Sequence, residues 1–338
     1  MLIHTDYPLK SCTTFHVDAK AKFFVDINSI EDLRLLSSKD EFLDNKKLFL
    51  GEGSNVLFTQ DYDGIILKNN LKGISVVEES EDSVIIESAG GEAWDKLVEF
   101  CVGNNYFGIE NLSGIPGTVG AAPIQNIGAY GVELKDVFES LDGIFTDEMK
   151  KGFFELNDCD FSYRHSVFKE RFKSNFFITK VRVKLSKVYG FKLNYRDLKE
   201  YFHLSKVKEI LLQDVRKAIL EIRRQKLPEP SEFGNAGSFF KNPEITIKES
   251  KELKVKFPDL VYFNIDENKV KIPAAWLIEK CNLKGYRLGD AATHAKQPLV
   301  IINMGNATGA EIISFAEHIQ NKVKQKFQID LIPEVNIL

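Results

Sequence analysis

Apolar and polar positions recur along the chain with two different periods, and together these predict a mixed α and β protein. Runs that alternate strictly, or that are rich in β-branched and aromatic residues, predict strands. Such runs cover residues 22–27, 48–50, 64–68, 83–88, 180–185 and 298–304. Over 180–185 the apolar residues alternate with charged ones, which is typical of an edge strand or of a strand with one buried face.

Apolar residues spaced three and four apart predict helices between these strands. Ser29 and Asp32 have the spacing of a capped helix start. A second helix is expected over 92–102, with Trp94 and Cys101 in the core. Further helices are expected over 206–224, 273–281 and 309–327. The helix over 206–224 is read from one apolar stripe: Val207, Ile210, Leu211, Val215, Ile219 and Ile222.

Length and charge narrow the class of protein. A chain of 338 residues is expected to form two or three domains. A net charge of −4, with both signs interspersed, argues against nucleic-acid binding, although Arg223, Arg224 and Lys226 could hold a small anion. The four cysteines lie far apart, without metal-ligand spacing, so we expect reduced thiols in a cytosolic protein and no metal site. Neither a leader peptide nor a membrane span is expected.

Residues 114–131 contain no charged side chain, but five glycines and three alanines. Glycine lets a flat ligand approach the backbone closely, so this run is suited to form a wall against a large planar cofactor. A buried turn between core elements would have the same composition, and composition alone does not choose between the two.

The turn Gly51-Glu-Gly53-Ser54-Asn55 interrupts two apolar runs. Successive backbone N–H groups in a glycine turn form an anion site, for which a diphosphate is a natural guest. A plain turn would have the same sequence. The pattern matches neither the dinucleotide-binding fingerprint nor the P-loop.

Three polar residues in apolar or small-residue surroundings are candidates for chemistry. Glu334 is expected within a short apolar strand, at least partly buried, where a carboxylate is either paired or functional. Ser238 lies in a predicted small-residue loop, 234–243, without the pattern of a hydrolase nucleophile. Arg164, in an aromatic-bearing loop over 158–169, could bind a carboxylate or form a surface ion pair.

Six segments, taken together and in order, resemble the UDP-N-acetylenolpyruvoylglucosamine reductase family, MurB. These segments are GEGSNVL (51–57), IPGTVGAAPIQNIGAYGVEL (115–134), YRHSVFK (163–169), GNAGSFFKNP (234–243), AAWLIEKCNLKG (274–285) and PEV (333–335). They cover nearly the whole chain. The stretch 188–202 is similar to the tyrosine-bearing loop of the type I branch.

The resemblance implies an α+β fold of the vanillyl-alcohol-oxidase type. A PCMH-like FAD-binding domain in two subdomains would be followed by a C-terminal α/β substrate domain. The implied boundaries are 1–70 for the first FAD subdomain, with 330–338 returning to the active site, 71–205 for the second, and 206–329 for the substrate domain.

The resemblance also implies the reaction. The family uses non-covalent FAD and NADPH to reduce UDP-N-acetylglucosamine enolpyruvate to UDP-N-acetylmuramate for peptidoglycan. A monomer with neither nucleic-acid nor membrane partner is expected. By position, Arg164, Ser238 and Glu334 match the family's catalytic residues. Arg164 and Glu334 would stabilise charge that develops toward the substrate carboxylate, and Ser238 would donate a proton to the adjacent carbon.

The matching cofactor residues place the FAD diphosphate on 51–57 and the isoalloxazine and ribityl chain along 114–131. They are Gly51, Gly53, Ser54, Asn55, Val56, Leu57, Ile115, Pro116, Gly117, Gly120, Ala121, Asn126, Gly128, Ala129 and Tyr163. The residues implied to contact substrate are Tyr195, Lys226, Asn242 and Gln297. His294 is most simply interpreted as a structural or surface histidine.

The chain departs from some family members at Ala121 and Ala122, where serines occur, at Asn336, where arginine occurs, and at Phe263, where tyrosine occurs. None of these changes removes a catalytic residue. Two other classes remain: a different flavin oxidase or dehydrogenase on the same scaffold, and a non-catalytic flavin- or nucleotide-sugar-binding protein. The pair of GNAGSFFKNP and PEV argues against the first, and the presence of Arg164, Ser238 and Glu334 argues against the second.

Overall fold

The structure is a computed structural model that describes residues 1–205 and 209–338. The described chain divides into two compact units. Unit 1 comprises residues 1–7, 21–53 and 63–225, and unit 2 comprises 8–20, 54–62 and 226–338. Each unit is therefore assembled from separate stretches of the chain. The boundaries implied by the family resemblance stay a prediction.

Unit 1 contains a sheet in the order β1-β2-β5-β3. Its strands are β1 (His4–Pro8), β2 (Lys20–Ile27), β5 (Tyr62–Asn69) and β3 (Lys47–Leu50), of which β3 and β5 run parallel. The helices α1 (Ile30–Leu36) and α2 (Asp40–Leu43) follow β2. The predicted cap of the first helix is confirmed, because Asp32 N–H donates to Ser29 Oγ and Ser29 N–H donates to the Asp32 carboxylate.

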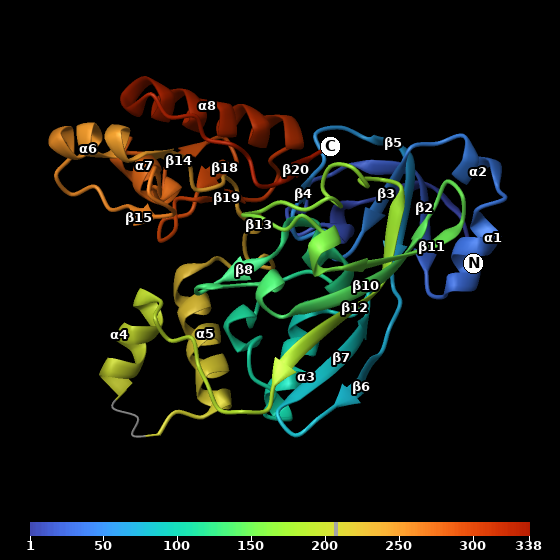
Figure 1. Cartoon of the computed structure of the whole chain (residues 1–338). Helices are drawn as coiled ribbons and strands as arrows, with labels where there is room; N and C mark the ends of the chain where they lie inside the picture. Colours follow the sequence, from blue (N-terminus) through green and yellow to red (C-terminus); the bar gives the residue numbers. More distant parts are fainter. Residues whose placement is uncertain (206–208) are drawn as a thin grey trace. The chain divides into compact units, whose positions relative to one another are not determined.

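The second sheet of unit 1 is antiparallel, in the order β11-β10-β12-β7-β6 (Figure 1). Its strands are β11 (Lys150–Glu155), β10 (Phe138–Phe145), β12 (Phe176–Ser186), β7 (Ser83–Ala89) and β6 (Ile74–Glu79). Strand β12 lies between β10 and β7, so the half-buried alternative for 180–185 is confirmed and the edge-strand alternative is wrong. Apolar and charged residues alternate over 180–185 because Val181, Val183 and Leu185 face the core.

The helix α3 (Trp94–Gly103) packs on this sheet through Trp94, Leu97, Val98 and Cys101, as predicted from their spacing. Two more helices, α4 (Arg196–Ser205) and α5 (Leu212–Lys226), share a small core of Leu198, Val215 and Ile219. The prediction of one helix over 206–224 is wrong at Ile210 and Leu211, because the Leu211 N–H donates to the Asp214 carboxylate and α5 begins after it. Val207 lies outside the described residues.

Unit 2 contains an antiparallel sheet in the order β13-β19-β18-β17. Its strands are β13 (Gly234–Ser238), β19 (Val300–Asn303), β18 (Ala291–Thr293) and β17 (Arg287–Leu288). The buried strand predicted over 298–304 corresponds to β19. The loop predicted over 234–243 is wrong for its first half, which is β13. Glycine is required there because a Cβ on Gly234 would lie 2.3 Å from Phe15 O.

A smaller sheet of unit 2 has the order β14-β16-β15. Its strands are β14 (Glu244–Thr246), β16 (Lys269–Lys271) and β15 (Phe263–Asn264), with the helix α6 (Ile247–Lys256) between them in the chain. The helices α7 (Ala274–Lys280) and α8 (Gly309–Phe327) confirm two predictions, and Thr308 and Glu311 cap α8 reciprocally. No described helix combines the length and apolar character needed to cross a bilayer.

Candidate active site

In unit 1, the start of the predicted phosphate turn lies directly on the uncharged run 114–131. A Cβ on Gly51 would be 2.4 Å from Thr118 Oγ1, so any side chain here would have to displace the Thr118 side chain, whereas glycine allows the close approach. The next residue, Glu52, accepts a hydrogen bond from Gly117 N–H at 2.8 Å. Gly53 has a φ of +64°, which favours glycine. Two segments that were predicted separately as cofactor-binding are thus brought together.

The run 114–131 also packs closely on its neighbours in unit 1. Gly120 N–H donates to Gly90 O at 2.7 Å, and Val119 N–H donates to Glu92 O at 2.8 Å. A Cβ on Gly120 would lie 2.9 Å from Gly90 O. Pro116 and Ala121, in contrast, are exposed. The segment therefore combines a buried, backbone-bonded side with exposed small residues. The buried-turn alternative describes its packed side, and the cofactor wall stays a prediction.

Arg164 contacts the far end of the same run. Its Nη2 donates to Gly128 O at 2.8 Å, and its guanidinium carbon lies 5.4 Å from the centre of the Tyr163 ring. Arg164 has a φ of +55°, a backbone conformation that is uncommon for a residue with a side chain and that is found preferentially at functional sites. The structure therefore places the predicted catalytic arginine and Tyr163 beside the predicted flavin wall.

Tyr195 lies beside Tyr130, with ring centres 5.3 Å apart and nearly perpendicular planes. Burial raises the pKa of Tyr130 to about 12, although Arg223 acts in the opposite direction, so this phenol is neutral at physiological pH. Asn111, which sequence reasoning missed, donates from Nδ2 to Tyr130 O at 2.9 Å and to Lys192 O at 2.8 Å. It links the end of the run 114–131 to the segment that precedes Tyr195.

In unit 2, a backbone hydrogen bond connects the neighbourhoods of Ser238 and Glu334. Glu334 N–H donates to Phe239 O at 2.8 Å, and Phe239 N–H donates to Leu299 O at 2.9 Å. Ser238, next to Phe239, is the last residue of β13 and pairs with Val300. The predicted burial of Glu334 is confirmed, since it is 9% exposed. It lies between a bridge at Pro333 and the strand β20 (Asn336–Ile337), and thus just outside the strand in which it was expected.

The second half of the predicted phosphate turn is joined to the C-terminal segment within unit 2. Strand β4 (Val56–Leu57) pairs in parallel with β20, and Asn55 Nδ2 donates to Glu334 O at 3.3 Å. Asn336 donates to Asn55 O from both its backbone N–H and its Nδ2, at 3.1 and 3.0 Å. Asn336, which stands where some relatives carry arginine, therefore binds the C-terminal segment to the turn through two hydrogen bonds.

The predicted substrate contacts of unit 2 differ in their surroundings. Lys226 is exposed at the end of α5. Asn242 Oδ1 accepts the N–H of Ala274 at 2.9 Å and so caps α7. Gln297 N–H donates to His294 Nδ1 at 3.3 Å, and burial lowers the pKa of His294. Phe263 is 60% exposed on β15.

The candidate residues therefore form two groups. Unit 1 holds Gly51, Gly53, the run 114–131, Tyr163 and Arg164, with Tyr195 beside Tyr130. Unit 2 holds Ser238, Glu334, Asn55 and the remaining predicted substrate contacts. Sequence reasoning missed Glu52, Asn111 and Thr118, because each acts through a partner that no local pattern reveals.

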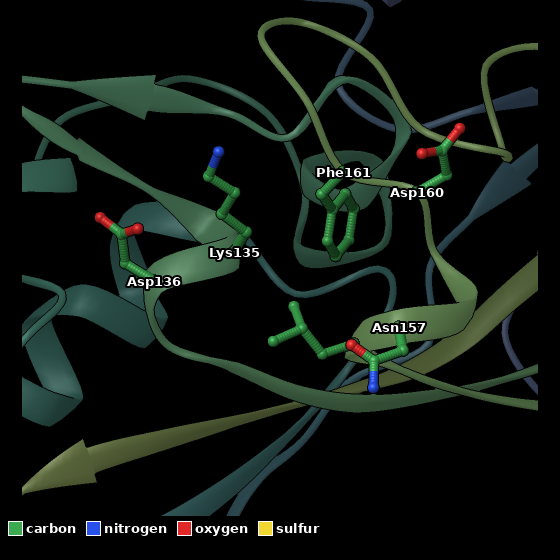
Figure 2. Close-up of a pocket in the computed structure, with 6 residues that line it drawn as sticks. Lys135, Asp136, Asn157, Asp160 and Phe161 are labelled. Carbon is green, nitrogen blue, oxygen red and sulfur yellow. The ribbon is translucent and has the colours of Figure 1, made fainter.

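A pocket of about 440 Å³ opens elsewhere in unit 1 and contains none of the predicted site residues. Figure 2 shows the Phe161 ring at its centre, with Lys135 and Asp136 on one side and Asp160 on the other. Its lining mixes both charges with apolar carbon, and nothing about it indicates a particular ligand.

The residues present fit a flavin dinucleotide. The glycine turn at Gly51 and Gly53 offers backbone to a diphosphate, and the adjoining run 114–131 presents small uncharged residues to a flat ring. Asn55 and Ser54 add polar side chains at the turn. No side chain of the run 114–131 would oppose the anionic cofactor by charge.

The comparisons with known proteins agree with this fit. A family model described as an FAD-binding domain matches residues 23–147, and a model described as the C-terminal domain of UDP-N-acetylenolpyruvoylglucosamine reductase matches residues 229–338. The chain is thus an FAD-dependent oxidoreductase with a PCMH-type FAD-binding domain, and the predicted fold class is confirmed.

Curated relatives make the assignment more specific. The UDP-N-acetylenolpyruvoylglucosamine reductase of Flavobacterium johnsoniae is 41% identical over 340 residues and covers 100% of both chains, and that of Amoebophilus asiaticus is 42% identical with the same coverage. The chain belongs to the UDP-N-acetylenolpyruvoylglucosamine reductase family. A crystal structure of the Thermus caldophilus member shares the fold, with a TM-score of 0.65 over 99% of this chain and 98% of that one at 21% identity.

Proposed function

We propose that this protein reduces UDP-N-acetylglucosamine enolpyruvate to UDP-N-acetylmuramate, with NADPH as hydride donor and non-covalently bound FAD, in peptidoglycan precursor synthesis. The observation that carries the proposal is full-length identity of about 40% to reductases of this name, combined with the presence of Arg164, Ser238 and Glu334. The residues 188–202 support membership of the type I branch. We further propose a cytosolic monomer.

When bound, the flavin supplies the hydride chemistry. Overall, the enol ether C=C bond gains a hydride and a proton, while NADPH becomes NADP⁺. Arg164 provides a fixed positive charge for the substrate carboxylate, toward which negative charge develops as the hydride arrives. Glu334, two residues before β20, adds a second polar group to this stabilisation. Ser238 donates the proton to the carbon next to the one that accepts the hydride.

Other chain residues bind and orient the substrate. Lys226 is a mobile point charge suited to a diphosphate, and Tyr195 and Asn242 contact the uridine diphosphate part. Gln297 is a further polar contact in the same unit as Ser238. The domain boundaries implied by the family, 1–70 with 330–338, 71–205 and 206–329, are part of this proposal.

The first prediction separates the two half-reactions in Ser238→Ala. NADPH is expected to reduce the flavin at nearly the wild-type rate, because Ser238 acts only on the sugar. Reoxidation by UDP-N-acetylglucosamine enolpyruvate is expected to slow by about 10²-fold or more, since a positioned proton donor contributes about 10² to 10⁴. Stopped-flow absorbance measures both rates. Ser231→Ala, an exposed hydroxyl in the same segment, is the matched control. Full turnover by Ser238→Ala would refute the assigned role.

A further inference from the structure

Two segments of unit 1 are fastened to each other beside the candidate catalytic arginine. Residues 124–128 belong to the run 114–131, and residues 162–166 carry Arg164. Three hydrogen bonds join them, and we call this set the clasp. They run from Ser166 Oγ to Ile124 O (2.7 Å), from Asn126 Nδ2 to Ser162 O (3.1 Å) and from Arg164 Nη2 to Gly128 O (2.8 Å).

Asn126 is the most constrained member of the clasp. It is fully buried, with 0% exposure. Its Nδ2 also donates to Glu133 Oε2 at 3.0 Å, and its Oδ1 accepts the Lys135 N–H at 3.0 Å. Both amide hydrogens and the amide oxygen are therefore engaged by the protein itself. Its φ of +44° is a conformation that asparagine tolerates better than most residues.

Arg164 needs support of this kind. A residue with a side chain is strained in the left-handed region, so its neighbours must hold it there. The clasp binds the chain two residues before Arg164, at Ser162, and two residues after it, at Ser166. Ser166 is itself fully buried and also accepts the Phe168 N–H at 3.2 Å.

We propose that Asn126 is a positioning residue that acts through Arg164, and that its side chain does not bind the flavin. This goes beyond the family resemblance, which groups Asn126 with the cofactor contacts. It rests on the proposed function, because the role of Arg164 is part of that function. Glu133 extends the same arrangement, since its carboxylate accepts from Asn126 and lies 3.1 Å from Lys135 Nζ.

The test uses Asn126→Asp in the flavin-loaded protein. Aspartate keeps the acceptor for the Lys135 N–H and tolerates the backbone conformation, but it loses the donor to Ser162 and repels Glu133. We expect unchanged flavin content, flavin reduction by NADPH within about twofold of wild type, and reoxidation by the UDP-enolpyruvyl sugar slowed about tenfold or more. Asn157→Asp makes the same chemical change at an exposed site in unit 1 and is the control.

A double-mutant cycle with Arg164→Lys distinguishes positioning from an independent role. If Asn126 acts through Arg164, the double variant is expected to reoxidise less than about twofold more slowly than Arg164→Lys alone, because the effects of coupled residues are not additive. Additive losses, or a loss of bound flavin in Asn126→Asp, would overturn the proposal.

A readout without turnover tests the clasp by itself. Hydrogen exchange followed by mass spectrometry is expected to show faster exchange in both 124–136 and 160–170 of Asn126→Asp than of wild type. Unchanged exchange over 160–170 would contradict the clasp. If the wild type fails to reoxidise with the sugar, the proposed function falls, and the exchange result still decides on the clasp. Should Asn126→Asp fail to fold, Ser166→Ala removes one bond of the clasp, together with the bond from Phe168 N–H, without adding charge. It should show the same changes in exchange to a smaller extent.

Discussion

At the scale of single residues, Gly309 shows how closely the backbone of unit 2 is packed. Gly309 is the first residue of α8, and a Cβ there would lie 1.9 Å from Phe58 O and 2.7 Å from Thr59 Cα. These are backbone atoms that follow β4, so they cannot move without disturbing the turn that carries Asn55. The glycine is required for the helix start to reach this position.

We therefore predict that Gly309→Ala lowers the free energy of unfolding by about 2 kcal/mol or more, at the upper end of overpacking effects. Gly103→Ala, at the end of α3, is the matched control, because a Cβ there has no neighbour within 4 Å. That variant should be stabilised by up to about 1 kcal/mol through helix propensity. Urea denaturation measures the free energy of unfolding of both variants. Equal stability of the two would show that the packing at Gly309 is wrongly described.

The resemblance marks Arg164, Ser238 and Glu334 as catalytic residues, and this assignment stays a prediction. The burial of Glu334 was predicted from its apolar neighbours and is confirmed. The contacts that Glu52 and Asn336 make could not be found in this way. Their partners, Gly117 and Asn55, are distant in sequence, and a lone carboxylate or amide in a loop gives no signal of which backbone group it will bind.

At the scale of elements, Asp95 joins α3, α5 and the start of the run 114–131. Its carboxylate accepts hydrogen bonds from both Nη atoms of Arg216, at 2.6 and 2.8 Å, and from the Gly114 N–H at 2.6 Å. Burial opposes ionisation of Asp95, but the hydrogen bonds from Arg216 and Gly114 outweigh it and lower its pKa. The ion pair is bidentate, the geometry in which arginine and carboxylate bind best.

A carboxyl group whose pKa is lower in the folded state stabilises the fold above its unfolded pKa, about 3.9 for aspartate, and ceases to do so as pH falls through the folded value. We predict that Asp95→Asn is less stable than wild type at neutral pH and that the difference shrinks below about pH 4. Thermal unfolding at a series of pH values measures the difference in stability between Asp95→Asn and wild type. Asp63→Asn is the control, since that side chain is 83% exposed. A difference that persists unchanged at low pH would contradict the account.

Asn111 gives a second prediction at this scale. Asn111→Leu removes the donors to Tyr130 O and Lys192 O, so the segment before Tyr195 loses this hydrogen-bonded link to the run 114–131. If Tyr195 contacts the substrate, KM for the UDP-sugar should rise about three- to tenfold, with a smaller change in kcat. Steady-state kinetics decides. A fall in kcat at constant KM would show that Asn111 affects chemistry and not substrate binding.

Elements with strong local signals were predicted well. The helix over 309–327 has both a cap and a regular apolar stripe, and its bounds are confirmed at α8. The strand β13 was missed because Gly234, Ala236 and Gly237 have low β propensity, and its pairing with β19 depends on residues distant in the chain. A glycine-rich strand and a glycine-rich loop have the same local pattern.

At the scale of the whole molecule, the length of the chain predicted more than one domain but not the path of the chain between the units. Residues 8–20 and 54–62 belong to the same unit as 226–338. The contacts responsible include the β4–β20 pair and the hydrogen bond from Asn303 Nδ2 to Phe15 O at 3.2 Å. Such pairings join residues from opposite ends of the chain, and hydrophobic periodicity carries no information about them.

The most direct test of the proposed function is an anaerobic visible spectrum of the purified, flavin-loaded protein. NADPH is added first, and UDP-N-acetylglucosamine enolpyruvate is added after it. The account predicts that the oxidised flavin bands disappear with NADPH and return in full with the sugar, in proportion to the amount of sugar added. A flavin that NADPH reduces but the sugar never reoxidises would contradict the proposed reaction, while leaving the FAD-binding fold intact.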